Sequence, residues 1–439
     1  MLPRDIAQNM LNLLSVKLIE LIACALDDRV ELLALRCVCR HLYQATSVIF
    51  TRAWFTTLTI DFTPRCLHRL SNITKHDDLT LAVRCLRVAD CYRPPMIRPL
   101  GLHEHDRRTR VLGEGLLWPQ TAGGFLDLTS QQVNQFTVLL ARFSLCTEIC
   151  VTDDLDESPH PDDRADTKLF PIEACYIMLN LLARYRDLHI QNFTISFDRA
   201  LKSDKTTRMP PGLTDLLVLS SWPTHLHHLN ITWKIYDDSV SASVVMDLMI
   251  MAKCAQSMKL SLPNSPVSED IFQFISQAPQ LPALTELTLS DIHWLTPDIL
   301  SAVIARFQGS LKSLHIDHVT LSDGDFNTFF GLLAGQNLPV LESITVADCF
   351  RVFFCPLRLN QDALKQCGGK SEFTLRHFRH KHRVNGMRYR GSGDGMRLAL
   401  QTLADNSCYQ LGAGPPSPGL VDTGDYVGDR VGHIVEKFT

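Results

Sequence analysis

A Leu-x-x-Leu-x-Leu pattern recurs at a nearly constant period in the second half of this chain. Five copies align, with spacings of 29, 29, 27 and 30 residues between their first positions. The copies are Leu226, Leu229 and Ile231; Ala255, Met258 and Leu260; Leu284, Leu287 and Leu289; Leu311, Leu314 and Ile316; and Leu341, Ile344 and Val346. One such unit cannot bury its apolar face alone, so the pattern predicts stacked units with one continuous core.

Helices are expected between the strands of this array. The clearest has Thr296 as its cap and Pro297 in its first turn, with apolar residues at helical spacing. Two more are expected, one after Ser268 and one after Ser322-Asp323. Strand, helix, strand at this period resembles the leucine-rich-repeat family, which implies a parallel sheet on a concave side and helices outside.

The pattern is looser toward the N-terminus, where wider gaps indicate insertions. The three candidate copies there are Val83, Leu86, Val88 and Cys91; Cys146, Ile149 and Val151; and Tyr185, Leu188 and Ile190. The strings Val88-Ala89-Asp90-Cys91 and Val346-Ala347-Asp348-Cys349 both place a cysteine where the repeat family has asparagine or cysteine. We interpret both cysteines as structural caps of the strand.

Alternate residues of each strand would point away from the core onto one broad surface. Most of them are expected to be solvated strand residues. In the five regular copies these positions are His228, Asn230, Thr232, Ser257, Lys259, Ser261, Glu286, Thr288, Ser290, Ser313, His315, Asp317, Ser343, Thr345 and Ala347. The candidate target-binding residues among them are His228, Asn230, Lys259, Glu286, His315 and Asp317.

The first fifty-odd residues carry an apolar pattern of helical period. It predicts helices over residues 16–25 and 29–43, with Asp27 and Asp28 at the break. On periodicity alone this is a helical hairpin that caps the next domain. The string Leu35-Arg36-Cys37-Val38-Cys39-Arg40, followed by Leu42, resembles the last helix of the F-box, and Leu14 to Leu26-Asp27 resembles its first part. Ser15 stands where that family usually has proline.

The F-box resemblance covers about residues 12–53 and implies a three-helix module that binds a Skp-type linker protein. That linker joins a cullin and a RING subunit to form a ubiquitin ligase. The candidate linker-binding residues are Leu14, Leu18, Ile19, Ile22, Val38 and Leu42, some of which are expected to be internal core. The aromatic and β-rich run over residues 52–60 is similar to the junction between the F-box and the following domain in fungal F-box proteins. It predicts the first strand of that next domain.

Composition and charge indicate a folded protein without an evident nucleic-acid face. Hydrophobic residues make up 45% of the 439, and the formal net charge is −4. The most apolar internal window, residues 244–255, is too short to span a bilayer, and no signal peptide is apparent. The fourteen cysteines are scattered singly, as in a reducing compartment. We therefore expect no membrane or nucleic-acid partner and a cytoplasmic or nuclear protein.

Three local segments suggest binding sites only superficially. The acidic run at 153–163 lacks the glycine and final glutamate of a calcium-binding EF-hand and predicts an inserted loop, although it could dock a basic partner. The basic run at 376–383 lacks a zinc-ligand pattern; a solvated strand, a nuclear address or a phosphate contact remain open. The glycine-rich residues 391–395 follow Arg388-Tyr389-Arg390, which does not resemble a buried strand, and predict a turn.

The expected organisation is mixed α/β: a small all-α F-box-like module (1–55), an α/β leucine-rich-repeat-like horseshoe with irregular repeats (56–355), and a C-terminal cap with a flexible Gly/Pro tail (356–439). No catalytic motif, metal site or cofactor site is evident. The function we expect is that of a non-catalytic substrate-recognition adaptor in a ubiquitin ligase. The alternatives are a repeat scaffold outside any ligase and a hydrolase with dispersed catalytic residues.

Overall fold

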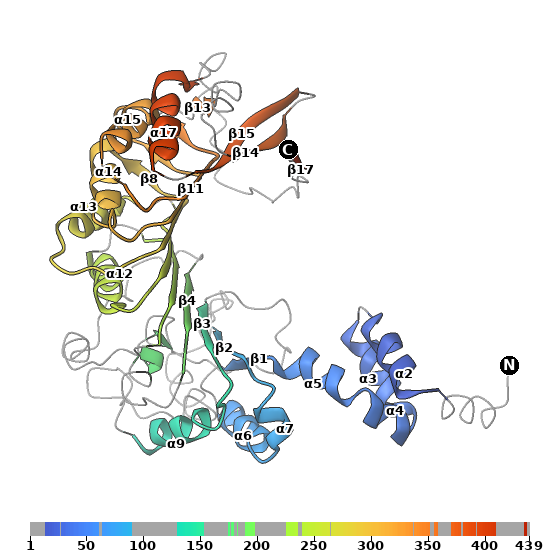
Figure 1. The fold of residues 1–439 in the computed structure, drawn as a ribbon. Helices are drawn as coiled ribbons and strands as arrows, with labels where there is room; N and C mark the ends of the chain where they lie inside the picture. The colour runs from blue at the N-terminus through green and yellow to red at the C-terminus, as the bar shows by residue number, and fades with distance from the viewer. Residues whose placement is uncertain are drawn as a thin grey trace, which may run out of the picture. The chain divides into compact units, whose positions relative to one another are not determined.

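The computed structural model (Figure 1) shows a mixed α/β protein that divides into two compact units, residues 1–190 and 191–439. It describes residues 14–26, 28–60, 64–89, 130–152, 174–175, 177–179, 182, 189–197, 225–235, 239–263, 265–336, 338–351, 355–358, 370–378, 381–391, 393–409 and 434–436. The acidic run at 153–163 lies outside these residues, as does most of the C-terminal tail. Within the described part, no helix is long and apolar enough to cross a membrane.

The first unit begins with a helical module made of α2 (Val16–Cys24), α3 (Arg29–Val38), α4 (Arg40–Ala45) and α5 (Ser47–Phe55). The single helix expected over residues 29–43 is two helices, because Cys39 is extended, with φ −158° and ψ 163°. The strand expected from residue 52 begins only at Thr57, since 52–55 continue α5. The module has a small core of Ile19, Leu42 and Ala45, against which Leu14, Leu35 and Cys39 pack.

The rest of the first unit pairs three parallel strands in the order β1-β2-β3. Its elements are β1 (Thr57–Ile60), α6 (Pro64–Ile73), α7 (Asp77–Thr80), β2 (Cys85–Ala89), α9 (Gln131–Leu140) and β3 (Glu148–Thr152). Leu58 aligns with Leu86, and Leu86 with Ile149, so the two looser copies expected at 83–88 and 146–151 are confirmed as neighbouring strands. Strand β1, which was expected as a strand, pairs with β2 and so begins a further repeat that was not among the expected copies of the Leu-x-x-Leu-x-Leu pattern.

The second unit contains a larger sheet whose parallel strands run in the order β4-β5-β6-β7-β9-β11 and whose last three strands, β15-β14-β17, are antiparallel. A second sheet has the order β16-β13-β12-β10-β8. The strands are β4 (Asn192–Phe197), β5 (His228–Trp233), β6 (Ser257–Ser261), β7 (Glu286–Ser290), β8 (His293–Leu295), β9 (Ser313–Asp317), β10 (Thr320–Leu321), β11 (Ser343–Ala347), β12 (Phe350–Arg351), β13 (Cys355–Arg358), β14 (Lys370–Phe378), β15 (Lys381–Arg390), β16 (Cys408–Tyr409) and β17 (Ile434–Glu436).

The five regular copies of the sequence pattern occupy one register of this sheet. Leu229, Met258, Leu287, Leu314 and Ile344 align across β5, β6, β7, β9 and β11, and all are buried. The copy expected at Tyr185, Leu188 and Ile190 is displaced. Strand β4 begins at Asn192, so Phe193 and Ile195 align with Leu229 and Ile231.

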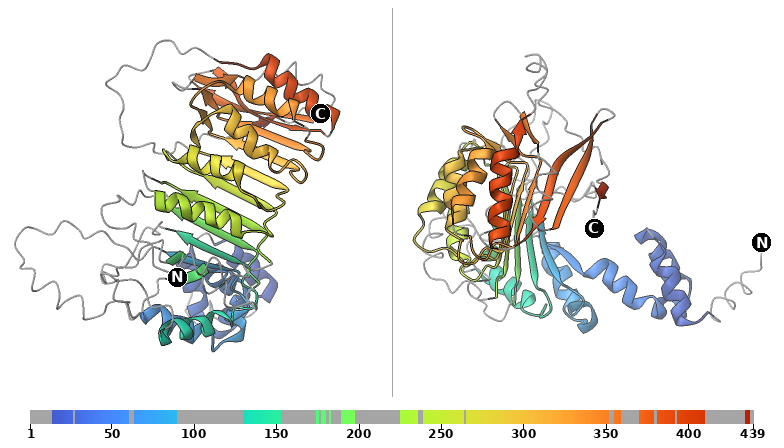
Figure 2. Two further views of the ribbon diagram at one scale, coloured as in Figure 1. Left: turned by 90° about the vertical axis from the view of Figure 1, so that its left-hand side faces the viewer. Right: turned by 45° about the horizontal axis from the view of Figure 1, so that its top comes forward.

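Among the described residues of this unit, five helices cover one face of the larger sheet, and no described helix covers the other face (Figure 1; Figure 2). They are α12 (Ser239–Met251), α13 (Ser268–Gln277), α14 (Pro297–Ala305), α15 (Phe326–Gly335) and α17 (Asp394–Asn406). Thr296 caps α14 as expected, because its hydroxyl accepts from the Ile299 amide at 3.3 Å. The cap of α15 is Asp325, two residues beyond the predicted Ser322-Asp323. Ser268 is the first residue of α13.

The C-terminal segment completes this unit with a hairpin and a helix. The basic run at 376–383 lies in β14 and β15, except for residues 379 and 380, which are not described. Tyr389 is fully buried in β15, which corrects the expectation that residues 388–390 are not a buried strand. Its hydroxyl donates to the Gly395 carbonyl at 3.1 Å, and α17 begins within the expected turn, at Asp394.

One side chain ties α17 to α15. The Asn327 amide nitrogen donates to the carbonyls of Ala404 and Ser407, each at 2.7 Å. Ala404 belongs to the last turn of α17, where helix carbonyls lack intrahelical partners, and Ser407 is the residue that follows the helix. We expect Asn327→Ala to lower the unfolding free energy by about 1–3 kcal/mol, measured by urea denaturation. If the variant were as stable as the wild type, water would fully replace the two hydrogen bonds that the Asn327 amide donates.

Candidate binding surfaces

Helix α2 exposes one apolar face while it buries another. Ser15 caps the helix and its hydroxyl accepts from the Leu18 amide at 3.4 Å, so the residue in the expected proline position supplies a cap. Ile19 is buried four residues before Ala23, toward the module core. Leu18 and Ile22 have the same spacing on the adjacent face and are 50% and 45% exposed.

Exposed apolar side chains are concentrated in the helical module. Among the described residues, nine of the fourteen exposed large hydrophobic side chains lie between residues 16 and 48. These nine are Val16, Leu18, Leu21, Ile22, Val30, Leu33, Val38, Tyr43 and Val48, which we call the module apolar surface. Scattered exposed leucines are ordinary on a soluble protein, but this density in a short segment is typical of a docking surface.

The six linker-binding residues predicted from the sequence divide between surface and core. Leu18, Ile22 and Val38 belong to the module apolar surface. Ile19 and Leu42 are only 1% exposed and form the core, with Leu14 packed against them, so these three do not line the surface. Sequence reasoning missed the other six members of the surface. The sequence did contain a signal for them, because the apolar residues of this segment occupy more than one face of its helices.

Arg36 holds the module together from inside. It is 6% exposed, and its Nη1 donates to the Tyr43 carbonyl at 3.2 Å and to the Thr46 hydroxyl at 3.3 Å. Its guanidinium also lies 4.2 Å from the ring centroid of Tyr43 and 3.9 Å from that of Phe50. The arginine of the Leu35–Arg40 string therefore links α3, α4 and α5 and fixes the helices that carry the surface.

The second candidate surface is the helix-free face of the larger sheet, which we call the strand face. The fifteen positions predicted from strand alternation lie on it in three rows across β5, β6, β7, β9 and β11. The middle row continues from Lys259 through Thr288, His315 and Thr345 to Arg388 of β15. Because all of these strands are in register, each row aligns residues from distant parts of the chain across the sheet.

The six predicted target-binding residues lie in these rows with different surroundings. His228 and Lys259 are exposed, and the Asn230 amide donates to the Thr194 hydroxyl at 3.3 Å. The other three, Glu286, His315 and Asp317, lie close together on β7 and β9. The structure thus places these three on two adjacent strands, with Lys259 on the next strand, β6, and with His228 and Asn230 one strand farther, on β5.

A polar cluster surrounds His315. Its Nε2 lies 3.6 Å from a carboxylate oxygen of Glu286 and 2.9 Å from the Ser313 hydroxyl. Burial lowers the pKa of His315; Glu286 opposes this shift, and Arg388 adds to it. Partial burial raises the pKa of Asp317, and the nearby carboxylates of Asp348 and Asp291 add to the increase.

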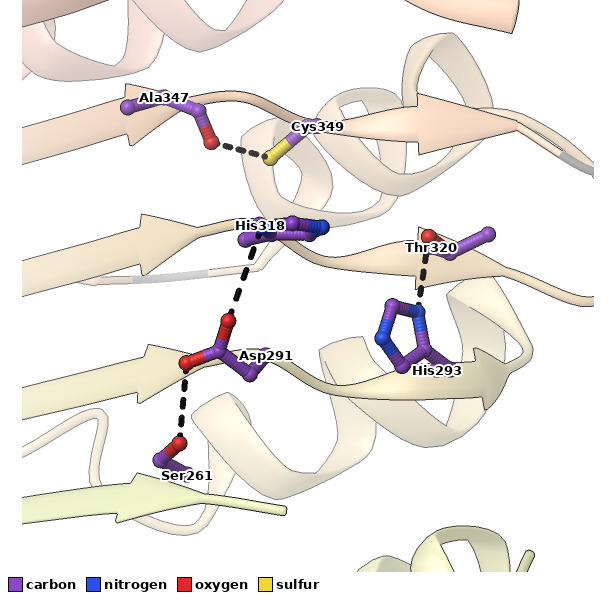
Figure 3. A network of polar contacts seen from close by, with 7 residues as sticks. All are labelled: Ser261, Asp291, His293, His318, Thr320, Ala347 and Cys349. Carbon is purple, nitrogen blue, oxygen red and sulfur yellow. Dashed lines mark hydrogen bonds and ion pairs between the residues drawn. The ribbon is translucent and has the colours of Figure 1, made fainter. Parts of the chain in front are cut away.

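A second polar network follows the C-terminal ends of the strands (Figure 3). The Ser261 hydroxyl donates to the Asp291 carboxylate at 3.0 Å, and the other oxygen of Asp291 lies 3.6 Å from His318 Nδ1. The carboxylate thus lies between the hydroxyl and the imidazole, whereas an activated serine contacts the imidazole directly. Ser261, Asp291 and His318 therefore connect neighbouring repeats and do not form a nucleophile with its base.

The same chain turn ends three successive repeats. Asp291, His318 and Asp348 have φ values of 51°, 53° and 44°, in the left-handed region that Asp and His tolerate better than most residues. The next residue in the last of these turns, Cys349, is buried, and its thiol donates to the Ala347 carbonyl at 3.3 Å (Figure 3). Burial raises the pKa of this thiol, which suits the structural role predicted for it. Asp90 and Cys91 lie outside the described residues.

Acid should destabilise the folded chain through two histidines. Burial lowers the pKa of His293 and of His315 below the ordinary 6.5, so the unfolded state binds more protons as the pH falls through that value. Stability is then lost with falling pH. We expect the Tm to decrease between about pH 7.5 and pH 5.5, and His293→Gln with His315→Gln to flatten that decrease. A wild-type Tm independent of pH over this range would contradict the assignment.

Asp317 and Asp247 have the opposite pH dependence. Burial raises the pKa of both above the ordinary 3.8, so their contribution to stability is present at low pH and lost as the pH rises through the folded pKa. The comparison of wild type with the double histidine variant separates the histidine contribution from theirs, because both proteins retain the two carboxyls.

Comparison of the chain with models of known protein families gave no match, and comparison with curated proteins gave none either. Among the residues that the structure describes, no group of three or more His, Cys, Asp or Glu side chains is placed to hold a metal ion.

Proposed function

We propose that the chain is a substrate-recognition adaptor of a ubiquitin ligase, with an F-box-like module that binds a Skp-type linker and a leucine-rich-repeat-like unit that binds the target. The observation that carries the proposal is the module apolar surface. Leu18 and Ile22 project from the helix face next to the one that already forms the core, so their exposure needs another explanation.

The chemistry of this surface suits a helical protein partner. An amphipathic helix pair that leaves a second apolar face open can bury it against another helical protein. Arg36 fixes α3 to α4 and α5 from within, so the surface is formed before the partner arrives. A preformed surface loses little conformational freedom on binding, which favours affinity.

The strand face supports the target-binding half of the proposal. It presents polar and charged side chains in rows across parallel strands, and these can contact an extended segment or a folded protein. An adaptor of this kind carries out no bond-breaking step. It holds the target close to the activated ubiquitin, which raises the effective concentration of the target's lysines.

Co-expression with a Skp-type linker tests the proposal. We expect the full chain and the linker to co-purify as a stoichiometric complex that survives size-exclusion chromatography. Addition of a cullin and a RING subunit should extend the complex. A well-folded chain that elutes without the linker would contradict the ligase assignment and favour a repeat scaffold that works outside a ligase.

A further inference from the structure

Four hydrogen-bonding atoms on the strand face are buried without a partner, and one of them, the Ser290 hydroxyl, lies apart on β7. The other three lie on two neighbouring strands: the hydroxyl oxygens of Ser343 and Thr345 on β11 and the Nε of Arg388 on β15. Ser343 and Thr345 are two residues apart and therefore point to the same face. Arg388 stands directly opposite Thr345 in the antiparallel pair, which places their Cβ atoms about 5 Å apart. The three groups thus form one local cluster.

Their chemistry calls for an acceptor with several lone pairs. Arg388 Nε can only donate, and the two hydroxyls can both donate. Nearly all buried polar atoms in folded proteins have partners, so three unpaired ones at a single place are unusual. A carboxylate or a phosphate group has enough oxygens to accept from all three, and charge-assisted bonds from arginine are the stronger ones.

The surrounding charges favour an anion on the β15 side of the cluster. Arg390 stands opposite Ser343, and Lys370 of β14 stands opposite Arg390; both residues are exposed. On the other side, Ser313 and His315 of β9 stand next to Ser343 and Thr345, and the Glu286 carboxylate of β7 lies 3.6 Å from His315. This mixed charge distribution disfavours general attraction of any anion and requires a ligand whose oxygens reach the donors.

We propose that Ser343, Thr345 and Arg388 form an oxyanion subsite that holds one acidic group of the target protein. The inference rests on the target-binding role proposed above, and it adds the kind of chemical group that the strand face recognises on the target. The acidic group has two sources, an Asp or Glu side chain or a phosphorylated Ser or Thr residue, which share the oxygens that the subsite needs.

Sodium acetate and sodium phosphate serve as probes, with sodium chloride at equal ionic strength as reference. We expect the anion that matches the subsite to raise the Tm of the full chain in a saturable manner. A response to phosphate alone indicates a phosphorylated target, and a response to acetate as well indicates a carboxylate. If neither anion stabilises the chain more than chloride does, the subsite proposal is wrong.

Two variants and a matched control localise the effect. Arg388→Met and Thr345→Val should each weaken the apparent anion affinity at least about fivefold. Lys253→Met removes an exposed cation that follows α12, outside the strand face, and should leave the affinity unchanged. An equal loss in Lys253→Met would reveal general charge attraction and overturn the subsite.

Thr345→Val also separates binding from folding. The substitution keeps the shape of the side chain and removes a buried hydroxyl that has no partner, so without anion the Tm should stay the same or rise. A lower Tm without anion would mean that the hydroxyl has a structural role and would contradict the proposal. Co-purification of these variants with the linker is measured in parallel. If the wild-type chain binds the linker but does not respond to either anion, only the subsite is refuted. If the wild-type chain does not bind the linker, the adaptor function is refuted.

Discussion

The double variant Leu18→Asp, Ile22→Asp should fold normally and lose binding to a Skp-type linker by more than about 100-fold. Both side chains are about half exposed, so two carboxylates there remain solvated in the free chain. In a complex the same carboxylates would be buried against apolar atoms without a partner, which is strongly unfavourable. The measurement is a titration of the linker with each purified chain, together with circular dichroism of both chains.

Two controls give this experiment its meaning. Leu398→Asp places a carboxylate at a comparably exposed leucine of α17 and should leave linker affinity unchanged. Ile19→Asp places one in the module core and should abolish binding by unfolding the module, with a loss of helical signal. Binding of the double variant at wild-type strength would show that the linker does not use this face of α2.

The second large effect is expected in the core of the repeat unit. Phe329 of α15 is fully buried, with its ring centroid 5.8 Å from that of Phe326 and 5.3 Å from that of Phe330. Phe329→Ala leaves a cavity among these rings and should lower the unfolding free energy by about 3–5 kcal/mol. Urea denaturation, followed by circular dichroism, measures the change.

The matched substitution for this prediction is Leu398→Ala, which truncates an exposed side chain and should change stability by less than about 0.5 kcal/mol. If Phe329→Ala were as stable as Leu398→Ala, the aromatic cluster would not be a packed core. Linker binding by Phe329→Ala should persist wherever the helical module remains folded, because the module has its own core.

Much of the repeat unit could be predicted from the sequence because inward-facing strand positions are apolar at a fixed spacing. The copy near residue 190 was misplaced for a specific reason. Ile190 is the last residue of one Leu-x-x-Leu-x-Leu match and the first of another that includes Phe193 and Ile195. The pattern alone cannot choose between them, whereas pairing of β4 with β5 decides the register.

The helical module shows a different limit of sequence reasoning. Ile19 and Leu18 are adjacent apolar residues, yet one is buried and the other exposed, because consecutive helix residues point about 100° apart and only one of the two apolar faces of α2 meets the core. Periodicity identifies a helix but cannot assign core and docking faces when both are apolar. The break at Cys39 was also hidden, since Leu35, Val38 and Leu42 continue the helical spacing across it.

The oxyanion subsite could not be predicted locally. Ser343 and Thr345 precede Arg388 by more than forty residues, and only the antiparallel pairing of β15 with β11 brings them together. The alternation of buried Tyr389 and Met387 with the two arginines beside Tyr389 was a usable strand signal. It did not indicate which strand would be the neighbour.

Calorimetric titration of the purified wild-type chain with a Skp-type linker tests the central claim most directly. We expect one-to-one binding with a negative heat-capacity change, because the module apolar surface leaves water on association. No binding by a chain that is folded by circular dichroism would contradict the adaptor function.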